Sequence, residues 1–143
     1  KIRKGLMLAL DLERYSYEKG SESLIRATEG TILDRLPPRI EIRKNAPIEL
    51  PHIMVLIDDK SDILFSLLEK ECGSTSECYS TELMEGGGNV TGYQVTGEQV
   101  FSDVAGVFGS LLKEAENRTG ANPLLFAMGD GNHSFATAKA IWE

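Results

Sequence analysis

Short runs of apolar residues, bounded by turn-forming residues, are the first pattern visible along this chain. Three of them, Gly5–Asp11, Pro51–Ile57 and Leu124–Met128, have the length and composition of buried strands. The polar, glycine-containing segment Ser16–Ser23 is predicted to be a loop. The stretch from Leu24 to Arg35 has neither the period of a strand nor that of a helix, so no element is predicted there.

Two longer segments repeat apolar residues at intervals of three and four, which predicts helices. The first is Ser61–Cys72, which Ser61 or Asp62 can cap and which Gly73 is expected to end. The second ends before Gly120, and its long apolar stripe is typical of packing against a core rather than of a cofactor-binding face. This stripe consists of Val100, Phe101, Val104, Val107, Phe108, Leu111, Leu112 and Ala115.

Two interpretations are open for the residues that follow Pro37 and Pro38. Pro38 can occupy the first turn of a helix that covers Arg39–Asn45. Alternatively, the two isoleucines that alternate with charged residues indicate a strand over Arg39–Arg43. We prefer the helix.

A glycine-rich reversal is predicted between two strand candidates, Glu77–Met84 and Asn89–Thr96. The same glycines could approach a phosphate, but they lack the Lys and Ser/Thr of a P-loop, so a hairpin is preferred. Antiparallel pairing here, with helices and strands alternating in the second half, predicts an α/β (α+β) fold with a mixed sheet and flanking helices. We expect residues 1–143 to form a single domain, or a partial domain of a longer protein.

Composition excludes several classes of protein. A chain of 143 residues with 41% hydrophobic and 26% charged residues is typical of a globular protein, and no apolar run has the length of a membrane span. The net charge of −7 argues against a nucleic-acid-binding face, which needs clustered basic residues. Cys72 and Cys78 are expected to be reduced thiols of a cytoplasmic protein. We expect a small-molecule ligand and neither a nucleic-acid nor a membrane partner, and the oligomeric state is left open.

The segment most suggestive of chemistry is Gly129–Ser134, between the last predicted strand and a predicted helix. The first turn of a helix has unpaired N–H groups and a dipole that favours anions, and glycine permits positive φ and close approach of a phosphate. Asn132 or Asp130 can cap the helix, while His133 can donate to a phosphate oxygen or move a proton. The ligand-binding candidates here are Gly129, Asp130, Gly131, Asn132 and Ser134.

Helical spacing divides the faces of this last helix. Phe135, Ala138 and Trp142 are expected to face the core, whereas His133 and Thr137 lie on a different strip. The simpler interpretation of the whole segment is a tight strand–helix turn with an aspartate as a solvated cap. Spacing alone does not choose between the two.

A second candidate stretch holds Arg26 and Glu29 and is followed by Arg35 and Arg39. Arginines with a nearby carboxylate can form a phosphate clamp with a built-in base, although an exposed charged loop is the simpler interpretation. The pair Asp58–Asp59 could bind a divalent cation, but such a pair more commonly starts a turn. No residue is assigned as a metal ligand.

Four segments together resemble the bacterial domain of unknown function family 1015, in the same order and over most of the chain. The usual family motif near the end reads Asp-Gly-His-His-Arg, and this sequence has Asn132 and Ser134 where His and Arg are usual. The family is in turn distantly similar to the ParB/sulfiredoxin-like fold, in which a Gly-x-His-Arg turn holds nucleotide phosphates and some members phosphorylate free serine. The four segments are Leu10–Tyr15, Ile25–Thr31, Pro51–Met54 and Asp130–Ser134.

The resemblance implies a nucleotide-dependent phosphotransferase that acts on a small hydroxylated metabolite, with a nucleotide and Mg²⁺ as cofactors. By motif, Gly131 and His133 would lie against a phosphate and Glu29 would be the base, so Glu29 and His133 are the catalytic candidates. The alternatives are a non-catalytic nucleotide- or anion-binding regulatory module and a purely structural turn. The enzyme hypothesis predicts that the Glu29 loop lies against the turn Asp130–Ser134.

Overall fold

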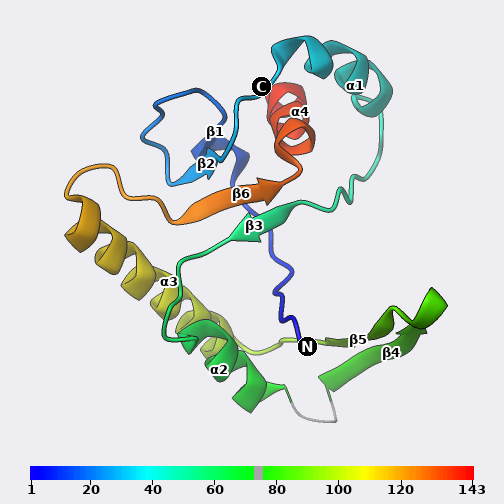
Figure 1. Cartoon of the computed structure of the whole chain (residues 1–143), viewed down its shortest axis with the longest axis vertical. Coiled ribbons are helices and arrows are strands. Elements are labelled where there is room, and N and C mark those ends of the chain that lie inside the picture. Colours follow the sequence, from blue (N-terminus) through cyan, green and yellow to red (C-terminus); the bar gives the residue numbers. More distant parts are fainter. Residues whose placement is uncertain (73–75) are drawn as a thin grey trace. The chain divides into compact units, whose positions relative to one another are not determined.

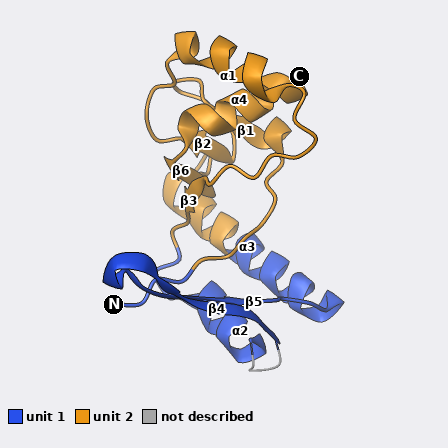
Figure 2. Cartoon of the chain, turned by 90° about the vertical axis from the view of Figure 1, so that its right-hand side faces the viewer, with its two compact units in different colours: residues 1–4, 59–110 blue, residues 5–58, 111–143 orange. Residues whose placement is uncertain are grey.

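A computed structural model describes residues 1–72 and 76–143, and these residues form two compact units. Unit 1 comprises Lys1–Lys4 and Asp59–Ser110, and unit 2 comprises Gly5–Asp58 and Leu111–Glu143 (Figure 2). The predicted helix end at Gly73 lies outside the described residues.

The centre of unit 2 is a four-stranded mixed sheet with the strand order β1-β2-β6-β3 (Figure 1). Strands β1, β2 and β6 are parallel to one another, and β3 pairs antiparallel with β6. With the helices beside it, this sheet confirms the predicted mixed α/β class. The strands are β1 (Tyr15–Ser16), β2 (Ile25–Ala27), β3 (Met54–Leu56) and β6 (Phe126–Asp130).

The core of unit 2 lies between the sheet and helix α4 (Asn132–Trp142), which follows β6 directly. Helix α1 (Leu36–Arg43) packs against α4 (Figure 1). The buried side chains come from the three parallel strands and from α1, α3 and α4; they include Tyr15, Ile25, Leu36, Leu111, Ala115, Phe126, Met128, Phe135, Ala136 and Thr137. Two 3-10 turns, η1 (Leu12–Arg14) and η2 (Leu33–Arg35), complete the unit.

The segment after the two prolines is the helix α1, as preferred, and it starts earlier than predicted. Pro37 and Pro38 occupy its second and third positions, in the first turn, where a missing amide proton costs no intrahelical bond. The alternating isoleucines do not form a strand. In the helix, Ile40 lies one turn after Leu36, and Leu36 is the residue that this segment buries.

Unit 1 holds helix α2 (Ile63–Glu71), a hairpin of β4 (Glu77–Leu83) and β5 (Gly88–Tyr93), and the first part of helix α3 (Glu98–Thr119). The hairpin confirms the predicted antiparallel pair, with the 3-10 turn η4 (Met84–Gly86) at its reversal. The extent of α3 is also as predicted, since Gly120 follows it with a φ of +74°.

Helix α2 is capped differently from the prediction. Asp62 precedes it with a φ of +51° and makes no side-chain cap bond. Instead the Asp59 carboxylate accepts hydrogen bonds from the backbone amides of Ile63 at 3.1 Å and Leu64 at 2.8 Å. Asp59 therefore serves a turn and a helix cap, and its neighbour Asp58 pairs with Arg118, in agreement with the turn interpretation of these aspartates.

Two strand predictions and one core prediction are wrong. Gly5–Asp11 has no secondary structure and leaves Met7 96% exposed, because a short apolar run becomes a strand only where a neighbouring strand accepts its backbone hydrogen bonds. Pro51–Ile57 is not a buried strand, since only Met54–Leu56 pairs, at the edge of the sheet. In the α3 stripe Phe101 is exposed, whereas Leu111 and Ala115 are buried.

No helix in the described part of the chain is long and apolar enough to cross a membrane. Both cysteines are free thiols, as expected.

Candidate functional site

The β6–α4 junction of unit 2 needs glycine at two positions. Gly131 has a φ of +85°, and a Cβ added there would lie 3.2 Å from the Cα of Ile53 and 3.4 Å from the carbonyl oxygen of His52. A Cβ on Gly129 would lie 3.0 Å from the side chain of Leu56. The two glycines therefore let the segment before β3 pass directly over the turn.

The first turn of α4 leaves backbone donors available. Its first backbone bond runs from Phe135 N to Gly131 O at 2.9 Å, and the N-cap residue Gly131 has no side chain to cap the helix. Asp130 does not cap the helix either, since its Oδ1 accepts from Gly131 N at 2.7 Å. Within residues 1–72 and 76–143, no acceptor pairs with the amides of residues 132–134, so three donors point out of the positive end of the helix dipole.

His133 is tied to the loop after β2. Its Nε2 accepts a hydrogen bond from the backbone amide of Ile32 at 3.1 Å. A ring nitrogen that accepts carries no proton, so in this arrangement the imidazole is neutral and its proton is on Nδ1. The ring is half-buried, and the carbonyl of His133 accepts from the Thr137 hydroxyl at 2.7 Å.

Asn132 is buried between the same loop and the core, with 4% of its surface exposed. Its side-chain Nδ2 donates to the backbone carbonyl of Glu29 at 3.5 Å. The backbone carbonyl of Asn132 accepts from the Tyr15 hydroxyl at 3.5 Å. The side-chain oxygen Oδ1 is buried and has no partner among the described residues. An unsatisfied buried acceptor costs about 1–3 kcal/mol, so this atom favours any ligand that brings a donor to it.

The loop 28–32 lies against the junction, as the enzyme hypothesis predicts. Besides the contacts of Glu29 and Ile32, the Thr28 hydroxyl donates to the carbonyl of Met128 at 2.5 Å. Glu29 itself is exposed, and it is the Glu29 backbone carbonyl that bonds to Asn132. The Glu29 carboxylate is therefore on the solvent side of a loop that is hydrogen-bonded to the helix start.

Arg26, in contrast, is not brought to the junction. Its guanidinium donates to the carbonyls of Ser23 at 2.5 Å, Asn122 at 2.7 Å and Pro123 at 2.5 Å. Asn122 and Pro123 precede β6, whereas the junction follows it. Arg26 therefore binds at the N-terminal end of β6, opposite to the junction.

A different arginine reaches the first turn of α4. Arg43, the last residue of α1, donates from Nη1 to the carbonyl of Ser134 at 3.1 Å. The same guanidinium binds the Glu49 carboxylate through two hydrogen bonds of 2.5 and 2.7 Å. The hydrogen bonds from Arg43 hold the pKa of Glu49 below its usual range. Nothing in the local sequence indicated Arg43 or Ile32, because both contacts join segments far apart in the chain.

Tyr15 packs against the first turns of α4. Its ring packs on Phe135 with a centroid distance of 4.5 Å and is fully buried. Burial raises the pKa of Tyr15 to about 12, with a further increase from Tyr17 and a smaller opposing effect of the Thr31 hydroxyl. The core face of α4 also differs from the prediction: Thr137 is completely buried, while Trp142 is 66% exposed.

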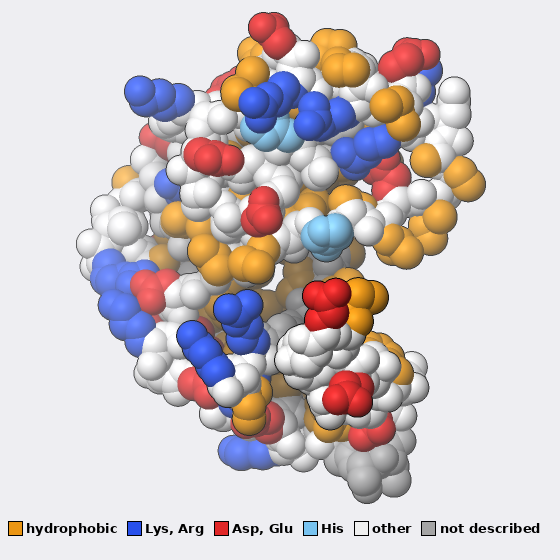
Figure 3. All heavy atoms as spheres, turned by 45° about the vertical axis from the view of Figure 1, so that its right-hand side comes forward, with side chains coloured by type: hydrophobic (Ala, Val, Ile, Leu, Met, Phe, Trp, Pro, Cys, Tyr) orange, Lys and Arg blue, Asp and Glu red, His pale blue; other side chains and the backbone are white. Residues whose placement is uncertain are grey.

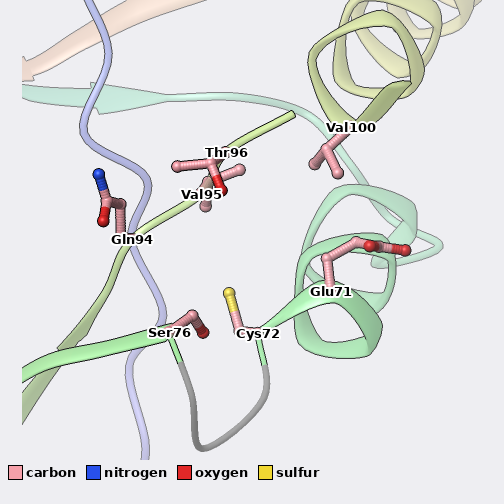
Figure 4. A pocket seen from close by; sticks show the side chains of 7 residues that line it. All are labelled: Glu71, Cys72, Ser76, Gln94, Val95, Thr96 and Val100. Carbon is pink, nitrogen blue, oxygen red and sulfur yellow. The ribbon is translucent and has the colours of Figure 1, made fainter. Parts of the chain in front are cut away.

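Two cavities lie apart from this junction. In the described ranges no group of three or more His, Cys, Asp or Glu side chains could hold a metal ion. A cavity of about 260 Å³ in unit 1 is lined by residues including Cys72, Gln94 and Thr96 (Figure 4). A second cavity, of about 210 Å³, lies in unit 2 beside Leu56 and Leu125. Neither cavity includes residues 129–134.

The fold and the junction define a mixed α/β protein with an anion-compatible strand–turn–helix segment. The model of a protein family of unknown function, DUF1015, matches residues 1–143, and the chain belongs to this family. Comparisons with curated proteins and with solved structures found no match.

Proposed function

We propose that the β6–α4 junction is the active site of a nucleotide-dependent phosphotransferase that acts on a small hydroxylated metabolite. The observation that carries the proposal is the position of the loop 28–32, whose backbone is hydrogen-bonded to both Asn132 and His133. These contacts hold the loop that carries the exposed Glu29 against the helix end, where the amides of residues 132–134 have no acceptor among the described residues. A base and an anion-binding turn are the two components that such a transfer needs.

The helix start supplies the phosphate-binding part. The amides of residues 132–134 donate to phosphate oxygens, and the helix dipole favours the negative charge. His133 adds a donor from Nδ1, since its Nε2 is engaged by the Ile32 amide. Gly131 makes room for the segment His52–Ile53, which a Cβ at this position would meet at 3.2 Å.

In the transfer step, Glu29 takes the proton of the metabolite hydroxyl. The hydroxyl oxygen forms a bond to the terminal phosphorus of the nucleotide, the bond from that phosphorus to the bridging oxygen breaks, and the shortened nucleotide leaves with the electron pair. The exposed Asp130 carboxylate is a hard oxygen ligand of the kind that Mg²⁺ accepts, and Mg²⁺ commonly takes its other ligands from substrate phosphates and water. When bound, Mg²⁺ would neutralise phosphate charge.

A second candidate function is a non-catalytic module that binds a nucleotide or another anion. Two observations favour it over turnover: Nε2 of His133 is already engaged by Ile32, and position 134 is a serine whose carbonyl is bound by Arg43. Both functions use the same donors at the helix start, and they differ in the role of Glu29.

The test measures binding and turnover separately in the full-length protein. Thermal shift with ATP and Mg²⁺ reports binding, because a ligand at 100 times its Kd adds about 2.7 kcal/mol to the free energy of unfolding. Release of ADP in the presence of hydroxylated amino acids and sugars reports transfer. Glu29→Gln is expected to retain the shift and to lower transfer by about 100-fold or more, whereas the control Glu18→Gln, another exposed glutamate of unit 2, retains both.

The outcomes separate the candidates. A thermal shift with a nucleotide, but no ADP release in the presence of any of the tested compounds, supports the binding module and contradicts the phosphotransferase. No shift with any nucleotide at millimolar concentration contradicts the phosphotransferase and a module that binds nucleotides.

A further inference from the structure

Helix α1 has arginines along one face, next to the candidate site. Arg35, Arg39 and Arg43 are spaced four residues apart, and Arg35 has helical backbone angles, so the three side chains lie on one strip. Arg43 is bound by the Glu49 carboxylate. Arg39 donates only to the carbonyl of Arg35, at 2.7 Å, and no carboxylate pairs with Arg35 or Arg39 in the part of the chain that the structure describes.

These two arginines lack acidic partners among the described residues although the protein is acidic. The chain has 22 acidic and 15 basic side chains, so exposed arginines have carboxylates in excess to pair with. Arg35 and Arg39 are both exposed. On the face drawn in Figure 3, Lys and Arg side chains gather beside a histidine. Two adjacent unpaired guanidinium groups favour an anion that comes from outside the chain.

Hydrogen bonds at both ends hold this strip beside the start of α4. Ile32, three residues before Arg35, donates to His133, and Arg43 at the other end donates to the carbonyl of Ser134. Arg39 lies between these two attachment points. Since eight helical residues extend only about 12 Å, the strip stays close to the unpaired amides of residues 132–134.

A separate observation indicates that a ligand completes this site. Asn132, the first residue of the eleven-residue helix α4, is buried, and its Oδ1 has no hydrogen-bond partner among the described residues. A ligand hydroxyl or amine at the helix start would satisfy this acceptor. The site therefore offers donors for anionic oxygens together with one acceptor for a polar group.

We propose that Arg35 and Arg39 bind a second phosphate group of the ligand, while the amides at the start of α4 bind the first. The ligand is then a nucleoside di- or triphosphate, and a monophosphate leaves the arginines unpaired. This inference rests on the proposed function, because it assigns the ligand class of the same site.

The test compares ATP, ADP and AMP, each with Mg²⁺, by isothermal titration calorimetry on the full-length protein. ADP and ATP are expected to bind ~10-fold or more tightly than AMP, because each charge-assisted pair contributes on that order. In Arg35→Gln/Arg39→Gln the affinity for ATP falls to that for AMP, and the affinity for AMP does not change. The matched control is Lys44→Gln, which removes a cation at the end of the same helix that is already paired with Glu41.

Equal affinity of the unchanged protein for AMP and ATP would overturn the inference and leave the proposed function standing. An equal loss of ATP and AMP affinity in the double variant would also overturn it. If no nucleotide binds the unchanged protein, the proposed function fails first. Melting temperature checks that the double variant is folded, as expected for two exposed side chains.

Discussion

His133 accepts a hydrogen bond through Nε2 from the backbone amide of Ile32, across 101 positions of sequence and a distance of 3.1 Å. This bond connects the loop of Glu29 to the first turn of α4 and sets the tautomer of the imidazole. It is therefore the contact on which the geometry of the candidate site depends most directly.

Removing this acceptor is expected to loosen the loop. In His133→Phe the Ile32 amide loses its partner, so its hydrogen exchange should accelerate, and the free energy of unfolding of unit 2 should fall by about 0.5–1.5 kcal/mol. Hydrogen exchange measured by NMR at the Ile32 amide checks this. The control is His52→Phe, at an exposed histidine. Unchanged exchange at Ile32 in the His133 variant would contradict the bond.

Gly131 is expected to be the most sensitive glycine of unit 2. Gly131→Ala combines a positive φ with contacts of 3.2 Å to Ile53, and should destabilise by roughly 2–4 kcal/mol. Gly20→Ala separates the two causes, since Gly20 has nearly the same φ, +83°, with nothing within 4 Å, and should cost only about 1 kcal/mol. Urea denaturation measures both variants. Similar losses of stability in Gly131→Ala and Gly20→Ala would show that the contact with Ile53 adds no cost.

The buried Tyr15 predicts a loss of stability at high pH. Its pKa is raised from about 10 to about 12, so its contribution is complete below pH 10 and is lost as the pH rises through 12, by at most roughly 2–3 kcal/mol. Urea denaturation between pH 9 and pH 12 measures this loss. In Tyr15→Phe this part of the pH dependence should disappear. An identical alkaline profile in both proteins would contradict the assignment to Tyr15.

The pair Arg43–Glu49 predicts a loss of stability in acid. Because the pKa of Glu49 is lowered, its contribution is complete above the ordinary pKa of a glutamate and is lost as the pH falls through the lowered value. Glu49→Gln should cost about 0.5–1.5 kcal/mol near neutral pH, a range reduced for partial solvent screening. Glu41→Gln, which removes an exposed partner of Lys44, is the control and should cost less than about 0.5 kcal/mol. Equal costs would show that the bidentate geometry adds nothing.

Local signals in the sequence predicted several elements correctly. The glycine run placed the hairpin, the apolar period and Gly120 gave the extent of α3, and the two prolines favoured the helix α1. The strand–glycine–helix segment around Gly131 was likewise visible, because a positive φ before a helix requires glycine. These features depend on neighbouring residues alone, so the sequence by itself determined them.

Only the tertiary structure decided which distant groups meet. Gly5–Asp11 has the composition of a strand but lacks a pairing partner, and Arg26 lies near the site in sequence yet binds the carbonyls of Asn122 and Pro123 at the other end of β6. The contact of Ile32 with His133 depends on how β2 and β6 align in the sheet. Hydrogen bonds between distant segments form only after packing has brought the segments together, and no local pattern records that step.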